Sequence, residues 1–320
     1  MAVARLLADI GGTNVRFAMQ RGADPAARIE VVGTADFGSI VEAVAAYFQR
    51  VGRPADLRIA AFAIACSVTG DQVSMTNTPW RFSTEQVRQA LGLDTLLVVN
   101  DFAAVAHSLP YLGPADVVPI GGGAPLPGAP MALLGPGTGL GTSGLVPSNG
   151  EWIVLEAEGG HVTMAPADDR ESAILGVLRP LYGHVSGERV VSGQGLVNLY
   201  TAIASLEGQP VETLQPPDIT RLGMAGNCPI CKEAVEVFCA MLGTLAGNLV
   251  LTLGALGGVY IGGGIVPRLG DTFFNSSFRR RFEEKGRFQS YLAPVPAYLI
   301  TARHPAFIGL QHLLDRIDPP

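Results

Sequence analysis

Two polar residues follow directly on an apolar run in the first third of the chain. Residues 95–99 read TLLVV, and Asn100 and Asp101 come next. The run predicts a buried strand, and residues 102–109 predict the helix that follows it. Ligands of open α/β sheets bind at the carboxyl ends of the strands. A carboxylate there can act as general base for an attacking substrate hydroxyl, an effect worth roughly 10²–10⁴ in rate. The alternative role for Asp101 is a helix N-cap, which Asp favours.

Two glycine turns that also carry a threonine are candidate phosphate sites. They comprise Gly11, Gly12 and Thr13, and further along Gly137, Thr138 and Gly139. Glycines let the backbone curl so that several N–H groups point into one concavity, which attracts anions. Asp9 precedes the first turn and is a candidate ligand for Mg²⁺, directly or through water, because Mg²⁺ usually keeps several waters. The alternative for either turn taken alone is an ordinary β-hairpin.

The common nucleotide-binding motifs are absent from the sequence. Neither of its two lysines, Lys232 and Lys285, follows a glycine, so there is no Walker A loop, and no protein-kinase strand lysine is present. The one GxGxxG, at residues 139–144, is followed by residues 145–150, which predict a strand end and a turn. A dinucleotide-binding motif would open a helix at that point. Phosphate binding by backbone N–H groups and hydroxyls therefore remains as the way in which this chain could bind a nucleotide.

The elements that would position these residues alternate between strand and helix. Residues 6–18 and 131–141 place apolar runs around glycine turns, which predicts two β-hairpins. Helical patterns cover residues 40–51 and 83–91, and residues 57–65 have the pattern of a strand. This alternation predicts an α/β architecture, and the repeated hairpin indicates two related α/β lobes.

The composition is that of a folded protein whose overall charge does not attract nucleic acid or anionic lipid. The chain has 320 residues, 48% of them hydrophobic, which is enough to bury a sizeable core. Its formal net charge of −6 provides no field that would attract nucleic acid or anionic lipid. The one basic run, residues 279–281, is followed by Glu283 and Glu284, which predicts a solvated helix face.

Residues 237–267 carry no charge and are long enough to cross a membrane. Asn248 and eight glycines between Gly243 and Gly264 favour another interpretation. We expect a buried helix to about Leu253, a glycine turn and a short strand at 259–261, and no membrane span. The N-terminus lacks the features of a signal peptide, which favours a cytoplasmic protein.

The four cysteines are too few for a disulfide scaffold in a chain of this length. Cys228 and Cys231 form a CxxC, but no second CxxC or histidine pair is nearby to complete a zinc site. We expect reduced thiols at the start of a helix.

Five short motifs occur in order along nearly the whole chain. They are residues 9–14, 100–102, 137–141, 158–161 and 262–264. Each alone is a weak signal, but the ordered set resembles the bacterial ATP-dependent glucokinases of the proteobacterial type. The resemblance implies an α/β protein with the two-lobed hexokinase and actin-like (ribonuclease H-like) fold, which binds its substrates in an inter-lobe cleft. It implies a small lobe of residues 1–110 plus about 301–320, and a large lobe of residues 111–300.

The resemblance also implies an activity and its site. The activity is transfer of the γ-phosphoryl group of Mg-ATP to the 6-hydroxyl of glucose, giving glucose 6-phosphate and ADP, with Asp101 as general base, in a cytoplasmic homodimer. The residues implied for the sugar are Asn100, Asp101, Glu158, His161 and Glu188. Those implied for ATP and Mg²⁺ are Asp9, Gly11, Gly12, Thr13, Gly137, Thr138, Gly139, Gly262, Gly263 and Gly264. We expect Glu188 to open a helix at residues 187–191, where the dipole favours an acid.

Two alternatives stay open at this point. One is a kinase for another hexose, such as fructose or mannose. The other is a sugar-sensing regulator without turnover, although the chain has no basic helix that would read DNA. A related group, the ROK sugar kinases, is kept separate. That group carries a cysteine-rich zinc motif after its Glu-x-Gly-His segment, whereas here no cysteine follows His161 until Cys228. This departure argues against a ROK kinase and against structural zinc.

Overall fold

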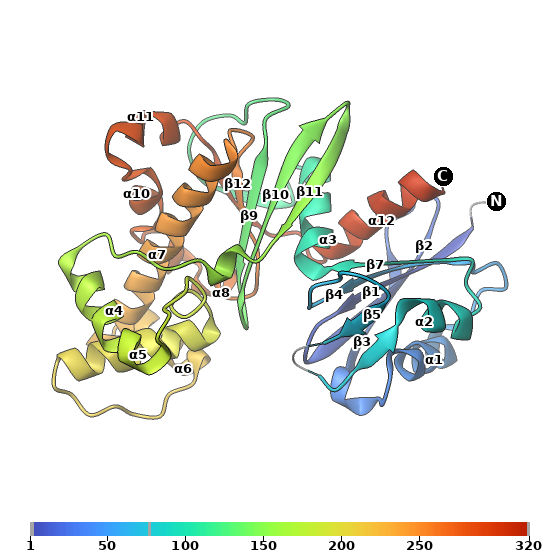
Figure 1. The fold of residues 1–320 in the computed structure, drawn as a ribbon, viewed down its shortest axis with the longest axis horizontal. Helices are drawn as coiled ribbons and strands as arrows, with labels where there is room; N and C mark the ends of the chain where they lie inside the picture. The colour runs from blue at the N-terminus through green and yellow to red at the C-terminus, as the bar shows by residue number, and fades with distance from the viewer. Residues whose placement is uncertain (1–2, 76–77, 319–320) are drawn as a thin grey trace. The chain divides into compact units, whose positions relative to one another are not determined.

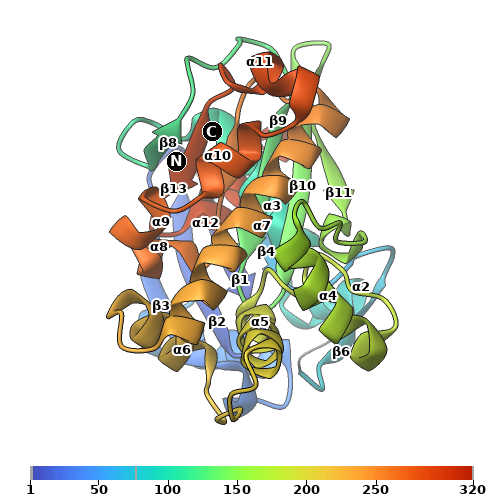
Figure 2. The ribbon, with the colours of Figure 1, turned by 90° about the vertical axis from the view of Figure 1, so that its left-hand side faces the viewer.

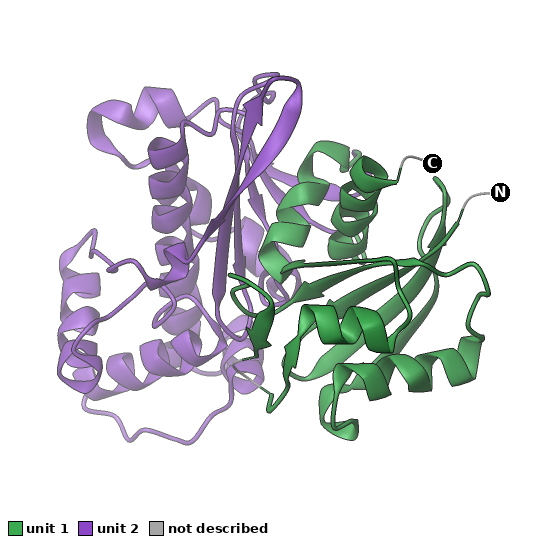
Figure 3. Cartoon of the chain, turned by 45° about the vertical axis from the view of Figure 1, so that its right-hand side comes forward, with its two compact units in different colours: residues 1–113, 302–320 green, residues 114–301 purple. Residues whose placement is uncertain are grey.

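The computed structural model describes residues 3–75 and 78–318. The chain divides into two compact units (Figure 3). Unit 1 consists of Met1–Gly113 and Ala302–Pro320, so the end of the chain returns to the first unit, and unit 2 is Pro114–Thr301. Each unit is a β-sheet with helices packed on it, which confirms the predicted α/β class.

Unit 1 is built on a five-stranded sheet with the order β3-β2-β1-β4-β7. Its strands are β1 (Ala4–Ile10), β2 (Asn14–Arg21), β3 (Ala27–Gly33), β4 (Ile59–Ile64) and β7 (Thr95–Asn100). Strands β1, β4 and β7 are parallel, and β2 runs antiparallel to both of its neighbours. The predicted hairpin at 6–18 and the strands predicted at 57–65 and 95–99 are confirmed. The prediction that residues 95–99 are buried is wrong, because β7 is the edge strand of the sheet and all its residues are half-buried. A separate two-stranded sheet pairs β5 (Gln72–Ser74) with β6 (Arg81–Ser83).

Helices cover both faces of this sheet (Figure 1). They are α1 (Ile40–Val51) and α2 (Thr84–Ala90) on one face, and α3 (Asp101–Ser108) and α12 (Pro305–Ile317) on the other. Strand residues alternate between the two faces. Leu6 and Phe62 belong to the apolar cluster that includes α1, whereas Leu7 and Ala61 belong to the cluster with Ala104 of α3 and residues of α12. The helices predicted at 40–51 and 83–91 are confirmed.

Unit 2 contains a six-stranded sheet with the order β11-β10-β9-β12-β13-β8. Its strands are β8 (Val117–Gly121), β9 (Met131–Pro136), β10 (Leu140–Ser148), β11 (Glu151–Ala157), β12 (Val259–Ile261) and β13 (Ala297–Ile300). Strands β9 and β10 form the predicted second hairpin. Strand β12 is the predicted short strand, and it pairs in parallel with both β9 and β13.

The two sheets repeat one topology. In β3-β2-β1-β4-β7 and in β11-β10-β9-β12-β13, two outer strands join antiparallel to three mutually parallel ones. The sequence motifs lie where these parallel strands end. Asp9 is near the end of β1, and Asn100 is the last residue of β7. The glycine turns at residues 137–139 and 262–264 directly follow β9 and β12. Ligands of such sheets bind at the carboxyl ends of the strands, so these motifs lie where a binding site is expected.

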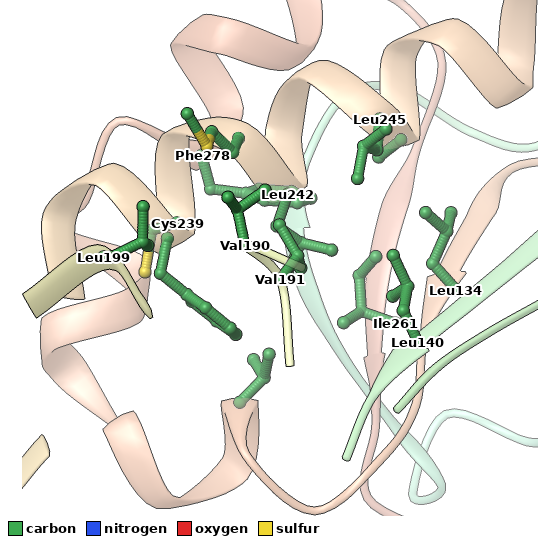
Figure 4. Packing of buried hydrophobic residues seen from close by; sticks show 14 of the residues in the cluster. Leu134, Leu140, Val190, Val191, Leu199, Cys239, Leu242, Leu245, Ile261 and Phe278 are labelled. Atoms are coloured by element: carbon green, nitrogen blue, oxygen red, sulfur yellow. The ribbon is translucent and has the colours of Figure 1, made fainter. Parts of the chain in front are cut away.

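A 25-residue helix, α7 (Pro229–Leu253), runs through the helical layer of unit 2 (Figure 2). The other helices of the unit are α4 (Asp169–Tyr182), α5 (Gly193–Leu206), α6 (Pro216–Met224), α8 (Val266–Leu269), α9 (Asp271–Phe274), α10 (Phe278–Glu283) and α11 (Gln289–Leu292). Leu242 and Leu245 of α7 share one apolar core with Leu134 of β9 and Ile261 of β12 (Figure 4).

Among the described residues, α7 alone is long and apolar enough to span a membrane. Its most apolar 18-residue window has a mean hydropathy of 1.8, and 78% of that window is buried inside the protein. Packing against α5, α6 and α10 therefore accounts for the apolar sequence, as expected for a core helix. The predicted buried helix ending near Leu253 is confirmed.

The basic run at 279–281 does not form a solvated face, so that prediction is wrong. The Arg280 side chain is 63% exposed, but Arg281 is only 5% exposed and forms an ion pair with buried Glu171. Arg279 is 18% exposed and stacks over the ring of Phe282. Consecutive residues of a helix are turned by about 100°, so three in a row cannot share one face.

Candidate functional site

The candidate site residues of unit 1 begin with Asp9, one residue before the end of β1. The hairpin register places it opposite Arg16 of β2, and Arg16 Nη1 donates a hydrogen bond to Asp9 Oδ2 over 3.0 Å. Burial raises the pKa of Asp9, while Arg16 and, more weakly, His304 oppose the rise. The Asp9 side chain keeps 24% of its surface exposed. The Asp9 carboxylate, next to the glycine turn, is therefore paired with the positive charge of Arg16. Arg16 is absent from the predicted site, and the hairpin register that pairs it with Asp9 is seen only in the structure.

The turn of Gly11, Gly12 and Thr13 is anchored by its carbonyl groups. Gly11 N–H donates to Asn14 O over 2.9 Å and closes the turn. Thr34 donates from its backbone N–H to Thr13 O over 2.9 Å, and from its hydroxyl to Gly11 O over 3.1 Å. The Thr13 side chain is exposed. A fixed backbone with an exposed hydroxyl suits anion binding, because little order is lost when a ligand arrives.

Asn100 and Asp101 follow each other at the end of β7, and the structure shows which of them caps α3. Asn100 is the N-cap of α3: its Oδ1 accepts from Ala103 N–H over 3.0 Å, and its Nδ2 donates to Cys66 O over 3.2 Å. The N-cap alternative for Asp101 is therefore wrong. Asp101 is the first residue of the helix, is partly exposed, and accepts from Phe102 N–H over 2.8 Å.

The thiol of Cys66 lies beside this carboxylate. Burial and, second, the Asp101 charge raise the pKa of the Cys66 thiol, which is thereby kept neutral. A neutral neighbour places no competing charge next to Asp101. The Asp101 carboxylate directly follows the parallel strand β7, at the carboxyl edge of the sheet.

In unit 2, the turn of Gly137, Thr138 and Gly139 joins β9 to β10. Gly137 N–H donates to Gly139 O over 2.8 Å, and Gly137 O accepts from Gly193 N–H, also over 2.8 Å. Gly193 is the first residue of α5, whose N-cap is Ser192. The turn is thus tied to the start of a helix, where backbone N–H groups and the helix dipole favour anions.

Glu188 packs directly against this turn. Its Oε2 accepts from Leu140 N–H over 2.9 Å, and a Cβ added to Gly139 would lie 2.5 Å from the same oxygen. The expected helix at 187–191 is wrong: these residues form turns, and α5 begins only at Gly193. A long-range hydrogen bond to Leu140, rather than a helix dipole, therefore holds this carboxylate in place.

Glu158 is the N-cap and His161 the last residue of a short 3₁₀ helix, Gly159–His161, after β11. Both side chains are exposed. Gly159 N–H donates to the Thr142 hydroxyl over 2.8 Å, and Gly160 O accepts from Glu188 N–H over 2.8 Å. These backbone contacts bring the segments that carry Glu158, His161 and Glu188 together beside the Gly137 turn.

The third glycine turn, Gly262, Gly263 and Gly264, follows β12 and lies against the end of β9. Gly262 N–H donates to Leu134 O over 2.7 Å. Gly263 has φ +78°, and a Cβ there would collide with Pro136 O. Pro136 ends β9 and directly precedes Gly137, so the second and third turns lie side by side. Within residues 3–75 and 78–318, no three His, Cys, Asp or Glu side chains form a ready-made metal site.

Comparison with known proteins identifies the family. The glucokinase family model matches residues 6–317. The glucokinase of Paramagnetospirillum magneticum is 53% identical over 315 residues, which cover 98% of each chain. The chain belongs to the glucokinase family. It is therefore an ATP-dependent sugar kinase, and neither a non-catalytic regulator nor a kinase for another hexose receives support.

Solved structures give the same fold. The crystal structure of glucokinase from an Antarctic psychrotroph matches with a TM-score of 0.89 and 37% identity, covering 99% of this chain and 100% of the other. A ROK family glucokinase from Streptomyces griseus, in complex with glucose and AMPPNP, has a TM-score of 0.66 at 18% identity and covers 97% and 98%. The second likeness concerns the fold alone, and it confirms the predicted hexokinase and actin-like α/β fold.

Proposed function

We propose that this glucokinase-family enzyme transfers the γ-phosphoryl group of Mg-ATP to the 6-hydroxyl of glucose, with Asp101 as general base. The observation that carries the proposal is the position of the Asp101 carboxylate, partly exposed in the first turn of α3 and at the carboxyl end of parallel strand β7. The Asp101 carboxylate accepts the hydroxyl proton as the sugar oxygen attacks phosphorus, and the leaving group is ADP.

Glucose is held by carboxylates, an amide and an imidazole. Each sugar hydroxyl both donates and accepts, so acceptors such as Glu158 and Glu188 need donors such as His161 beside them. The contact between Glu188 and the Gly137 turn supports a joint role, because it sets a sugar-binding carboxylate next to a phosphate-binding turn. Asn100 already uses its amide to cap α3 and to reach Cys66, so we assign it mainly to positioning Asp101; the second N–H of its Nδ2 can donate to the sugar.

The nucleotide phosphates bind to the Gly11–Thr13 and Gly137–Gly139 turns through the two threonine hydroxyls and backbone N–H groups other than those of Gly11 and Gly137, which close the turns. The Gly262–Gly264 turn faces the adenosine. Asp9 fits Mg²⁺, because a partly exposed carboxylate is a hard oxygen ligand and Mg²⁺ binds few protein ligands while keeping its waters. Bound Mg²⁺ neutralises phosphate charge. Arg16, paired with Asp9 over 3.0 Å, supplies a further positive charge where the sequence has almost no lysine.

We assign the two substrate-binding lobes to residues 1–110 with about 301–320 and to residues 111–300. The enzyme acts in the cytoplasm as a homodimer, by resemblance to its family. Glucose is the preferred hexose, ahead of fructose and mannose.

A coupled assay of ADP release with glucose and Mg-ATP tests the activity, and initial rates on glucose, fructose and mannose test the preference. A higher kcat/KM for another hexose would overturn the glucose assignment. For the base, Asp101→Asn should lower kcat by roughly 10²–10⁴ while glucose still binds and the fold is unchanged.

Asp169→Asn is the matched control, because Asp169 is likewise the first residue of a helix, α4, and is exposed. It should leave kcat unchanged. Near-normal turnover of the Asp101 variant would refute the general-base role.

A further inference from the structure

Two cysteines stand at the start of α7 and take no part in the proposed chemistry. Cys228 is the N-cap of the helix and is half-buried, whereas Cys231, the third helical residue, is fully buried. The sulfur of Cys228 accepts a hydrogen bond from Cys231 N–H over 3.2 Å. The sequence predicts reduced thiols at a helix start, and the structure places the Cys228 sulfur on the backbone of Cys231.

The capping geometry suits a disulfide. An N-cap side chain folds back over the first turn to reach the third residue, so the two Cys side chains approach each other. Residues three apart on a helix have Cβ atoms about 5–6 Å apart, and a small rotation closes this to the roughly 3.5–4.5 Å that a disulfide needs. Pro229 between them has a fixed φ and holds the first helical residue in place.

The two thiols differ in the way that exchange requires. Cys228 is half-buried and reachable from solvent, and its sulfur accepts the Cys231 N–H at the start of a 25-residue helix. Burial and the hydrogen bond to Cys228 raise the pKa of Cys231 to about 12. Cys228 is thus the attacking thiol and Cys231 the resolving one.

We propose that Cys228 and Cys231 form a reversible thiol–disulfide site that exchanges with small disulfides of the glutathione type. The Cys228 thiolate attacks the disulfide RSSR, forms a Cys228–S–S–R bond and releases RS⁻. Cys231 then loses its proton, attacks the Cys228 sulfur and expels the second RS⁻. The two protein thiols lose two electrons and two protons, and RSSR gains them as two RSH.

Helix α6 connects this pair to the Gly137 turn. At its far end, a Cβ added to Gly223 would lie 2.7 Å from Cys231 O, so α6 touches the first turn of α7. At its near end, the Pro216 ring lies 3.7 Å from an ideal Cβ on Gly193, whose N–H holds Gly137 O. We infer that oxidation shifts α6 and thereby alters ATP binding; this step rests on the proposed role of the Gly137 turn.

Mass spectrometry tests the site independently of activity. The full-length protein is equilibrated with reduced and oxidised glutathione, alkylated and digested with trypsin. Cleavage after Arg221 and Lys232 releases both thiols in one peptide, residues 222–232, separate from Cys66 and Cys239. We expect this peptide to lose two hydrogens and escape alkylation in oxidising buffer, and dithiothreitol to restore it. A peptide that stays fully alkylated in the most oxidising buffer would overturn the proposal.

Two variants test the order of attack. Cys231→Ala should trap a stable glutathione adduct on Cys228, because the resolving thiol is gone. Cys228→Ser keeps a capping side chain at the helix start, and its Cys231 should remain unmodified. An adduct on Cys231 in the Cys228→Ser variant would show that the asymmetry is wrong.

The coupling through α6 has its own readout. The KM for ATP should differ between oxidised and reduced wild-type enzyme by roughly two- to thirtyfold, and should not respond to glutathione in Cys228→Ser. By linkage, ATP binding must then shift the midpoint potential of the pair, by about 30 mV for a tenfold change in affinity. A disulfide that forms without either change would overturn the coupling, whereas inactivity of the reduced enzyme would count against the proposed function instead.

Discussion

Arg281 and Glu171 form a two-point ion pair inside unit 2. Arg281 Nη1 lies 2.8 Å from Glu171 Oε1, and Nη2 donates to Oε2 over 3.1 Å. The side chains are 5% and 2% exposed. Arg281 also donates to the Thr244 hydroxyl over 2.9 Å, and Glu171 accepts from Ala167 N–H over 2.7 Å. The pair therefore joins α10, α7 and the segment that enters α4.

Replacing Arg281 with Met should destabilise the protein strongly, because it leaves the Glu171 carboxylate buried without its counter-charge. Breaking a buried pair in this way costs about 3–5 kcal/mol of unfolding free energy. For a unit of this size, such a loss lowers Tm by roughly 6–20 °C. Circular dichroism during thermal and urea unfolding at pH 7 measures both quantities.

Arg280→Met on the same helix is the matched control. Arg280 and its partner Glu284 are 63% and 56% exposed, so breaking that pair should cost at most about 1 kcal/mol. The double variant Glu171→Gln with Arg281→Met removes both buried charges and keeps an acceptor for Ala167. It should recover at least half of the loss. Equal effects of Arg281→Met and Arg280→Met would refute the reasoning, as would a double variant no more stable than Arg281→Met alone.

Three further predictions concern the site and the first unit. Glu188→Gln should raise the KM for glucose roughly 10- to 100-fold with an unchanged circular dichroism spectrum, since a charged hydrogen bond is lost; an unchanged KM would exclude Glu188 from sugar binding. Burial and the charge of Arg316 lower the pKa of His107 to about 4. The folded state therefore favours the neutral imidazole, and this contribution to the unfolding free energy is complete above pH 6.5 and is lost as the pH falls toward 4. His107→Gln should accordingly lose less unfolding free energy between pH 7 and 5 than the wild type, and equal losses in urea titrations would contradict this. Gly263→Ala should cost more than about 1 kcal/mol and raise the KM for ATP, because φ is +78° and a backbone carbonyl blocks the Cβ, whereas Gly264→Ala meets open space and should be mild.

Local sequence patterns were enough to predict several of the main strands and helices of this protein. Apolar runs beside glycine turns predicted the hairpins β1–β2 and β9–β10, and the periodicity of residues 40–51 matched α1 to the residue. Such signals lie within a dozen residues of one another, so they survive without tertiary information. The order of motifs at the ends of apolar runs then predicted both the family and the edges of the sheets.

Side-chain partners were decided only by the tertiary structure. Asn100 rather than Asp101 caps α3, Glu188 bonds to Leu140 from a turn, and Arg281 is buried against Glu171. Each of these contacts depends on the direction in which a side chain points from its helix or strand, or on a partner far along the chain. Local sequence patterns specify neither.

The sequence by itself predicted the two hairpins, helices α1 and α2 and the strand that Asp101 follows, because backbone propensity and hydrophobic period are local. The tertiary structure decided which charge is solvated and which is buried, because that depends on how α4, α7 and α10 pack. It also placed the Cys228 sulfur on the Cys231 backbone N–H, since an N-cap side chain folds back over the first turn of its helix.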